Sequence, residues 1–359
     1  MTSVETPPDA PLARVSLTAG KLPRYTPIGL FVLCLAVMAG LLSLTGSFSI
    51  PLTVVLGTVL FAVALLVVSS VVEGGRAARD RFATTLMYSA FALALIPLIS
   101  LLWTVISAGI KRFDLYFLTY TMRGVYGGMD AGGAYHAIIG TLEITAFATV
   151  ISVPIGLLTA IYLVEYGPTR LGKAITFFVD VMTGIPSIVA GLFAYALFAL
   201  LFGPGVRMGA AGSVALAVLM IPVVVRASEE MLKLVPNELR EAAYALGVPK
   251  WLTIVKVVLP TSIAGITTGI MLSISRVIGE TAPLLIAAGF TQSMNWNLFD
   301  GRMSSLPVFV YTQYANQGNP PEAYLDRAWA AALTLILIVM ALNLIARLVA
   351  KFFAPKFGR

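Results

Sequence analysis

Eight long apolar runs constrain this chain more than any other feature of its sequence. A helix needs about 20 apolar residues to cross the ~30 Å hydrocarbon core of a bilayer. Hydrophobic residues make up 58% of the chain and charged residues only 11%, so the runs cannot all be covered by the polar surface of a soluble domain. We therefore predict an all-α polytopic membrane protein with about eight transmembrane helices. The predicted spans are 28–44, 50–72, 84–110, 138–164, 174–202, 213–225 (the shortest), 262–288 and 328–350.

The basic residues predict the side of the membrane that each loop occupies, because loops rich in Lys and Arg stay in the cytoplasm. With the N-terminus inside, 17 basic residues fall in inner segments and 6 in outer ones. We therefore expect a protein of the cell membrane with both termini in the cytoplasm. The net charge of +7 then reflects topology, and no nucleic-acid partner is expected. The six outer basic residues are Lys111, Arg112, Arg123, Arg207, Arg302 and Arg327.

The ends of the chain and its long loops have a different composition. Residues 1–27 are polar and Pro-rich, which predicts a disordered cytoplasmic tail, and 351–359 are expected to form a second cytoplasmic tail. Two long outer segments, 111–137 and 291–327, are rich in Gly, Tyr, Asn and Pro. They are either ordered loops that face a partner outside the cell or simple spacers.

A polar inner segment, 226–260, has a helical pattern at its centre. Asn237 is a suitable N-cap, Gly247 stands where helices end on a left-handed residue, and Pro249 prevents continuation, which predicts a helix over 238–246. A helix of two turns is marginal alone in water, so it must bind a surface. That surface is lipid headgroups or another protein, and the absence of Phe and Trp from the apolar face favours a protein. The apolar face consists of Leu239, Ala242, Ala243 and Leu246.

Two charges lie within the seventh apolar run, where each costs ~2.5–3.5 kcal/mol to insert. Arg276 and Glu280 are four residues apart, so on a continuous helix they share a face and can form an ion pair. Pro283 is expected to kink the helix just after them. In one interpretation Arg276 binds an anion in transit and Glu280 competes with that anion. In the other, the two form a static pair that holds the helix to its neighbours.

The fourth and fifth runs also contain polar features. Glu143 and Asp180 lie within two turns of a span end, and we interpret both as structural. Pro186 and Ser187 interrupt the fifth run. Because broken backbone at membrane depth must be satisfied by protein or a water-filled cavity, this break predicts a pathway lining or a tight helix contact.

The sequence contains no motif for an enzyme active site. The nucleotide-binding pattern G-x-x-x-x-G-K-[ST] is missing, and so are H-E-x-x-H and G-x-S-x-G. With one cysteine, Cys34, and one histidine, His136, neither a disulfide nor a cluster of Cys and His metal ligands is expected. The chain is therefore predicted to be non-catalytic, without a cofactor of its own.

Four stretches resemble a known family. Glu241-Ala242-Ala243, Gly247 after three residues and VVLP at 257–260 after nine more resemble the EAA motif, E-A-A-x3-G-x9-I-x-L-P, of ABC importer permeases, with Val257 in place of Ile. SRVIGETAPLL, GIPSIVAGLF and SLPVFVYTQYA are similar to the phosphate branch of that family, the PstA-type permeases, rather than to the sister PstC type. The similarity covers about 84–350, and the two spans in 28–72 are additional to the six known for the family.

The resemblance implies a type I ABC importer permease, MetI-like in fold, with six spans in 84–350 and its core in 138–350. It also implies ATP on separate PstB-type ATPases, two per complex, together with a second permease of PstC type, an extracytoplasmic phosphate-binding protein of PstS type, inorganic phosphate and the lipid bilayer. The implied coupling helix on the ATPase contains Glu241, Ala242, Ala243 and Gly247, and the implied phosphate pathway contains Arg276 and Glu280.

Other functions stay open at this stage. One arginine does not choose among tetrahedral anions, so the chain could belong to a permease for sulfate or molybdate. An autonomous channel or secondary transporter is typically built from inverted repeats with paired broken helices, and neither is visible in the sequence. A membrane scaffold without transport would leave Arg276 and Glu280 unexplained.

Overall fold

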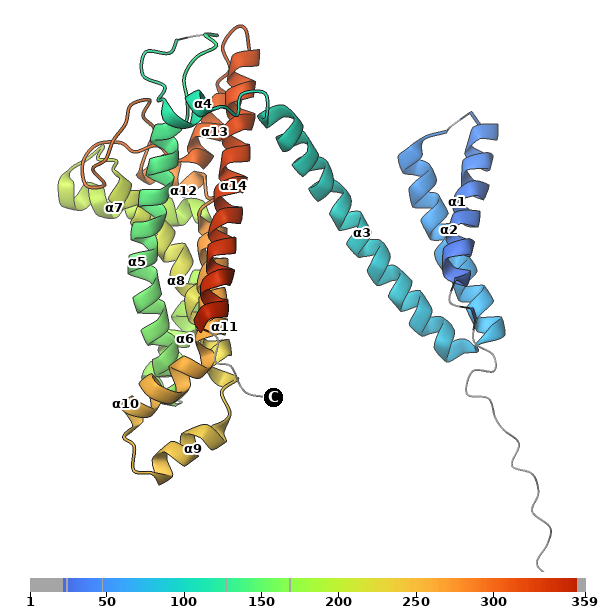
Figure 1. Cartoon of the computed structure of the whole chain (residues 1–359), viewed down its shortest axis with the longest axis horizontal. Helices are drawn as coiled ribbons and strands as arrows, with labels where there is room; N and C mark the ends of the chain where they lie inside the picture. The colour runs from blue at the N-terminus through green and yellow to red at the C-terminus, as the bar shows by residue number, and fades with distance from the viewer. Residues whose placement is uncertain (1–21, 24, 47, 127, 168, 354–359) are drawn as a thin grey trace, which may run out of the picture. The chain divides into compact units, whose positions relative to one another are not determined.

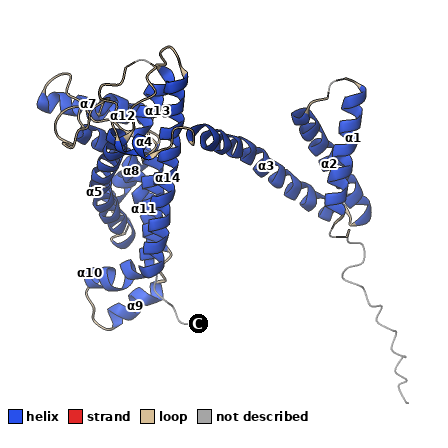
Figure 2. Ribbon diagram, turned by 45° about the horizontal axis from the view of Figure 1, so that its top comes forward, coloured by secondary structure: helices blue, strands red, loops and turns tan. Residues whose placement is uncertain are grey.

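The computed structural model describes residues 22–23, 25–46, 48–126, 128–167 and 169–353. Within these ranges the regular secondary structure is entirely helical (Figures 1 and 2), which confirms the predicted all-α fold. Contacts divide the chain into two compact units, 1–102 and 103–359. Most of the predicted N-terminal tail lies outside the described residues. At the other end, the last helix continues to Phe353, into the predicted C-terminal tail.

The N-terminal unit contains α1 (Thr26–Leu44), α2 (Ile50–Val72) and most of α3 (Gly75–Gly109). The first two helices agree with the two predicted N-terminal spans. Gly57 permits their close approach, because a Cβ atom there would lie 2.7 Å from Cδ2 of Leu35. The rings of Phe31 and Phe61 meet edge to face at 5.2 Å. Small residues and aromatic contacts thus hold this helix pair together.

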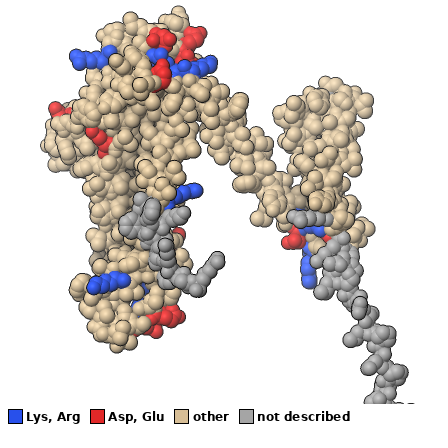
Figure 3. Space-filling model, viewed as in Figure 1, with Lys and Arg blue, Asp and Glu red and all other residues tan. Residues whose placement is uncertain are grey.

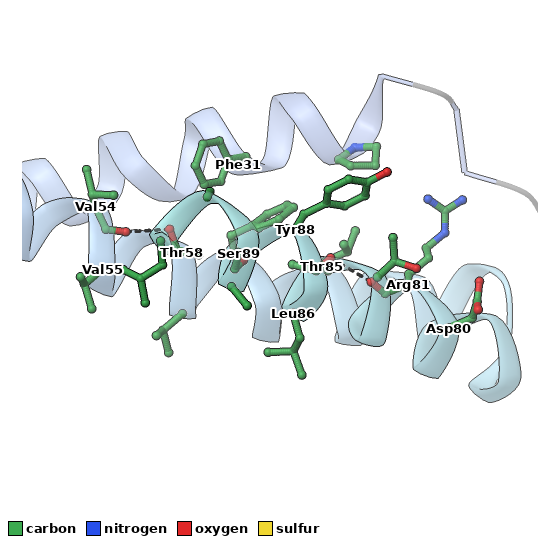
Figure 4. A pocket seen from close by; sticks show the side chains of 18 of the residues that line it. Phe31, Val54, Val55, Thr58, Asp80, Arg81, Thr85, Leu86, Tyr88 and Ser89 are labelled. Carbon is green, nitrogen blue, oxygen red and sulfur yellow. Dashed lines mark hydrogen bonds between the residues drawn. The ribbon is translucent and has the colours of Figure 1, made fainter. Parts of the chain in front are cut away.

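A groove of about 1220 Å³ lies between α1, α2 and α3 within the N-terminal unit (Figure 4). Its walls are mainly apolar, and Phe31 and Leu86 are among the side chains that line it. The hydroxyl groups of Thr58 and Thr85 donate to carbonyl oxygens of their own helices, at 2.7 and 2.8 Å. The groove therefore presents an apolar surface and contains none of the predicted site residues.

Glu73 connects α2 to α3. Its carboxylate accepts hydrogen bonds from Arg81 Nη2 at 2.7 Å, from the backbone N–H of Leu22 at 2.7 Å and from Ser69 Oγ at 2.8 Å. The hydrogen bond from Arg81 is the main cause that lowers the pKa of Glu73 from 4.5 to about 2. The stabilisation from this network is therefore complete above pH 4.5 and is lost as the pH falls through about 2.

Glu73→Gln is expected to loosen this connection at neutral pH, because the amide keeps the shape of the side chain without its charge. Amide hydrogens around Leu22 and Arg81 should exchange about tenfold faster, the effect of losing ~1.5 kcal/mol of charge-assisted hydrogen bonding. Hydrogen exchange with mass spectrometry at pH 7 measures this. Asp80→Asn provides the control, since the Asp80 carboxylate forms no hydrogen bond or ion pair with the described residues. Equal exchange in wild type and Glu73→Gln would contradict the prediction.

The second unit is a helical bundle. Its long helices are α5 (Tyr135–Glu165), α8 (Gly209–Lys233), α11 (Leu259–Val277) and α14 (Glu322–Phe353). Small residues bring them close together: a Cβ atom on Gly156 would lie 2.6 Å from Cγ1 of Val224, and one on Gly269 2.6 Å from Cβ of Ala227. The central core is therefore formed where α8 packs between α5 and α11.

Short helices cover the two ends of this bundle. At one end are α4 (Leu115–Thr119) and α13 (Leu306–Ala315), and at the other are α9 (Asn237–Ala245) and α10 (Lys250–Thr253) (Figure 1). We call these the α4 end and the α9 end. On the face shown in Figure 3 most of the charged side chains of the unit lie toward its ends, and the region between them is mainly uncharged. This distribution fits a bundle that crosses a bilayer.

The fifth predicted span is broken. It consists of α6 (Arg170–Thr183) and α7 (Ser187–Phe202), which are bent by 108° at the residues before Ser187. The predicted interruption at Pro186 is confirmed, but a single straight span over 174–202 is wrong. Among the described residues, seven helices are long and apolar enough to cross a membrane, and this bent pair makes eight if it is counted as one span.

The seventh predicted span is wrong at its C-terminal half. The helical stretch begins with α10, continues through the π-helix η1 (Ile254–Val258) and α11, and ends at Val277. The chain becomes helical again only in α12 (Ala282–Ala287). Pro283 explains the interruption, since it has no N–H for the carbonyl group four residues earlier and its ring clashes there. The proline produces a break where the sequence predicted a kink.

Candidate functional site

Arg276 lies in the last turn of α11, just before the helix is interrupted. Its side chain is exposed, and it forms no hydrogen bond or ion pair with the residues that the structure describes. A cation at the C-terminus of a helix interacts favourably with the helix dipole. The guanidinium group is therefore placed favourably while its five N–H donors remain available to a ligand.

Glu280 lies beyond the end of α11, in the four residues that separate this helix from α12. Its half-buried carboxylate has no hydrogen bond or ion pair among the described residues. The predicted ion pair with Arg276 is wrong, because the two residues no longer belong to one helix. The static-pair interpretation thereby loses its geometric basis, whereas a role of both residues in a pathway stays a prediction.

Two interrupted helices meet beside this break. A Cβ atom on Gly191 of α7 would lie 2.6 Å from Cα and 3.0 Å from the carbonyl oxygen of Pro283 in α12. On the other side of α12, a Cβ atom on Gly212 of α8 would lie 3.1 Å from Leu284. These contacts pack α12 against α7 and α8, whereas Gly279 in the break itself is exposed, with nothing within 4 Å of a Cβ atom there.

The predicted short helix is present as α9, and its C-terminus has the predicted geometry. Gly247 has φ +74°, its N–H donates to Tyr244 O at 2.9 Å, and Val248 N–H donates to Ala243 O at 3.1 Å. These two bonds form a Schellman motif, which needs a left-handed residue at the glycine position. The predicted cap by Asn237 is wrong, because that residue is the first of the helix and Pro236 precedes it.

The α9 helix packs on its own unit through only part of its predicted apolar face. Ala243 is buried, whereas Leu239 is exposed and Leu246 is 83% exposed. Trp251, at the start of the next helix, is 62% exposed. Several large apolar side chains therefore form a surface at the α9 end that is left for another molecule to cover.

A buried carboxylate holds α9 to the end of α5. Glu165 Oε1 accepts hydrogen bonds from Nη2 and Nε of Arg240, at 2.9 and 3.1 Å. Arg240 also donates to Val235 O at 2.6 Å, and Lys250 Nζ donates to Glu165 O. The ammonium group of Lys250 lies 4.7 Å from the ring centre of Tyr166. We call Glu165, Arg240 and Lys250 the α9 anchor, because they attach both ends of the α9 segment to one span.

The sequence pattern does not predict this anchor, because Arg240 and Lys250 fit an inner loop by charge alone and Glu165 belongs to none of the motifs. One signal was available: Glu165 is an acidic residue at the very end of an apolar run, without a basic residue within the preceding helical turns.

Glu165→Gln is expected to free the α9 segment from α5, because the half-buried Arg240 loses its counter-charge. Amides 237–248 should exchange roughly tenfold faster or more, as expected for the loss of a charged hydrogen bond worth ~1.5–3 kcal/mol. Hydrogen exchange of the purified protein tests this, with Glu238→Gln as a control at an exposed residue in the first turn of the same helix. If the two variants exchange alike, the anchor has no measurable effect.

A second charged cluster joins α6 to α8 near the α9 end. Arg226 donates to Asp180, and its Nη1 donates to Glu229 Oε2 at 2.8 Å. Lys233 Nζ donates to Glu229 Oε1 at 2.7 Å. Asp180 thus has a partner in a neighbouring helix, in agreement with its structural interpretation. Glu143, interpreted in the same way, has a buried Oε2 atom without a hydrogen-bond partner in the described part of the chain.

At the α4 end, a buried arginine organises the first long loop. Arg327 is 1% exposed, and its Nε donates to Gln313 Oε1 at 2.9 Å. Its Nη1 donates to the carbonyl oxygens of Met129 and Ala131, at 2.8 and 3.2 Å. The loop is therefore attached to α13 and α14, and the described part of segment 111–137 is more than a loose spacer.

Comparison with known proteins identifies the family. Residues 152–359 match the family described as binding-protein-dependent transport system inner membrane component. The chain belongs to this family. Together with the family match, the apolar helices identify a multi-pass membrane protein. The family match also confirms the predicted resemblance to ABC importer permeases. The matched region contains α9, α11 and α12 and begins inside α5, so α1 to α3 lie outside it.

Individual relatives extend the match. The chain is 50% identical over 287 residues to the phosphate transport system permease protein PstA 1 of Mycobacterium tuberculosis (strain ATCC 25618 / H37Rv), covering 79% of this chain and 91% of that protein. It is 40% identical over 285 residues to the permease protein PstA of Pasteurella multocida (strain Pm70), covering 78% and 96%. A bacterial alginate ABC transporter, solved with an alginate-bound periplasmic protein, shares the fold, with a TM-score of 0.52 at 13% identity over 75% of this chain and 93% of that chain.

Proposed function

We propose that this family member is the membrane subunit of an ATP-driven importer of inorganic phosphate and forms half of the translocation pathway. The observation that carries the proposal is Arg276, an exposed arginine without a partner at a helix break. A planar guanidinium group can donate two parallel hydrogen bonds to a tetrahedral oxyanion. The relatives named phosphate transport permeases support phosphate as that anion.

The α9 segment is the attachment point for the energy source in this proposal. A separate ATPase subunit covers Leu239, Leu246 and Trp251, which are exposed here, and Glu241, Ala242, Ala243 and Gly247 lie in the coupling contact. The α9 end then faces the cytoplasm, together with both termini. Two ATPases bind and hydrolyse ATP, while this chain is non-catalytic and transmits their motion through the α9 anchor to α5.

The remaining partners follow from the same orientation. A second permease subunit supplies the other half of the pathway, and an extracytoplasmic phosphate-binding protein docks at the α4 end. The loop attached by Arg327 supports this docking role, since its backbone is fixed by hydrogen bonds to the bundle. Closure of the ATPases moves the helices between two arrangements, so that phosphate passes Arg276 in one direction.

Purification of the tagged chain followed by transport measurement tests the proposal. We expect two ATPase copies and one different permease to co-purify, and the reconstituted complex to take up labelled phosphate only with ATP and the binding protein. Excess sulfate or molybdate should leave this uptake unchanged. Inhibition by either anion would indicate a permease for another oxyanion, and uptake without an ATPase would indicate an autonomous transporter.

A further inference from the structure

Two chain segments converge on the C-terminal end of α12. The N–H of Met208 donates to the carbonyl oxygen of Ala287 at 3.2 Å, and the N–H of Met303 donates to that of Ala288 at 3.2 Å. Both methionines are buried, and consecutive backbone carbonyls of α12 hold them. The residues directly before them in the chain, 207 and 302, are both arginines.

The two arginine side chains lie against one glycine. A Cβ atom on Gly289 would lie 3.2 Å from Cδ of Arg207 and 3.2 Å from Cγ of Arg302. Gly289 is buried and has φ +80°, a conformation that other residues rarely adopt. The backbone around α12 therefore brings together two cationic side chains that are 95 positions apart in the sequence.

Neither guanidinium group has a partner among the residues that the structure describes. Arg207 and Arg302 form no side-chain hydrogen bond or ion pair with the part of the chain that the structure describes, and neither does the carboxylate of nearby Asp300. Two other arginines at the same end differ: Arg112 lies 3.3 Å from an Asp130 oxygen, and buried Arg327 donates to three acceptors.

We infer that Arg207 and Arg302 form a receiving site for a tetrahedral oxyanion at the end of α12. The aliphatic parts of both side chains pack at Gly289, so one doubly charged anion can accept charge-assisted hydrogen bonds from both guanidinium groups. Arg276 precedes α12 in the chain, and the six residues of this helix span about 9 Å. An anion thus meets Arg276 before α12 and the Arg207 and Arg302 pair at the C-terminal end of this helix. That the anion is phosphate rests on the proposed function.

Transport by the complete complex tests the site. With Arg207→Gln or Arg302→Gln, phosphate uptake into proteoliposomes at saturating binding protein should fall about tenfold, as expected for the loss of one charge-assisted contact. ATP hydrolysis without the binding protein should stay unchanged, which shows intact assembly. Arg123→Gln is the matched control, because it removes an exposed charge from the same end of the unit. Wild-type uptake in both single variants and in the double variant would overturn the inference.

A labelling experiment separates the site from transport. In a Cys34→Ser background, Asp300→Cys provides a single thiol two residues from Arg302. Inorganic phosphate should slow its reaction with an anionic thiol reagent in the complex without the binding protein, and this protection should vanish in Arg207→Gln/Arg302→Gln. The inference would be overturned if phosphate does not slow the labelling of the introduced thiol and if saturating binding protein restores uptake in the arginine variants. That result would show that the two arginines bind the phosphate-binding protein instead of the anion. If sulfate but not phosphate slows the labelling of this thiol and is taken up, the anion site is supported and the proposed phosphate function is rejected.

Discussion

Arg276→Gln should abolish phosphate uptake while the chain still inserts and assembles with its partners. Glutamine cannot supply a charge or a pair of parallel donors, so at least ~3 kcal/mol of interaction with the anion is lost, which corresponds to a decrease of a hundredfold or more. The folded state should be little affected, because Arg276 has no protein partner among the described residues. Uptake by proteoliposomes and the yield of the assembled complex measure the two effects separately.

Two variants sharpen this test. Arg276→Lys keeps the charge but not the planar fork and should transport at an intermediate rate. Arg347→Gln removes an exposed arginine from α14 and should transport normally. Uptake at the wild-type rate in Arg276→Gln would remove this residue from the pathway. Poor assembly of that variant would instead favour a structural role.

Gly247→Val should uncouple ATP hydrolysis from transport. A β-branched residue is strained at φ +74°, at a cost of roughly 1–2 kcal/mol, so the Schellman motif opens and α9 loses its fixed C-terminus. Nothing lies within 4 Å of a Cβ atom at this position, so strain rather than a clash produces the effect. We expect the phosphate transported per ATP hydrolysed to fall about tenfold, as estimated from that strain.

Gly46→Val is the control for Gly247→Val. Gly46 has φ +68° and also has no atom within 4 Å of a Cβ position, but it lies between α1 and α2. The same backbone strain there should leave coupling unchanged. If both variants couple normally, or if both fail alike, the geometry of α9 has no special role in transmitting the ATPase motion.

Local signals predicted the features that depend on neighbouring residues. The spans followed from apolar runs, the break before α7 from Pro186, and the end of α9 from Gly247 and Pro249. Each of these signals acts within one or two helical turns, because backbone preferences and missing donors are local properties. The family motif added the identity of the partner that a short helix requires.

Two features could not be predicted from local signals. The α9 anchor depends on a contact between residues distant in the sequence, and the break between α11 and α12 depends on two alternative helical structures that fit the same apolar pattern. Glu165 and Arg240 are 75 residues apart, and no helical or strand period relates them. The apolar pattern from 262 to 288 fits one long helix as well as two shorter helices. Pro283 disfavours the continuous helix, and packing of α7 and α8 on α12 favours the interrupted form, so the spacing of Arg276 and Glu280 alone does not predict their separation.

The π-helix η1 fixes the direction in which Arg276 points relative to α9. The N–H of Leu259 donates to Ile254 O, five residues back, and the following proline, Pro260, has no N–H to offer. A π turn holds one more residue than an α turn, and one residue corresponds to ~100° of helical rotation. The last residues of the EAA motif therefore set an angle as well as a contact. Deleting one residue within η1 would let an ordinary α turn close and leave the direction of Arg276 nearly unchanged, whereas deleting one residue from α11 before Arg276 would turn this side chain by ~100°.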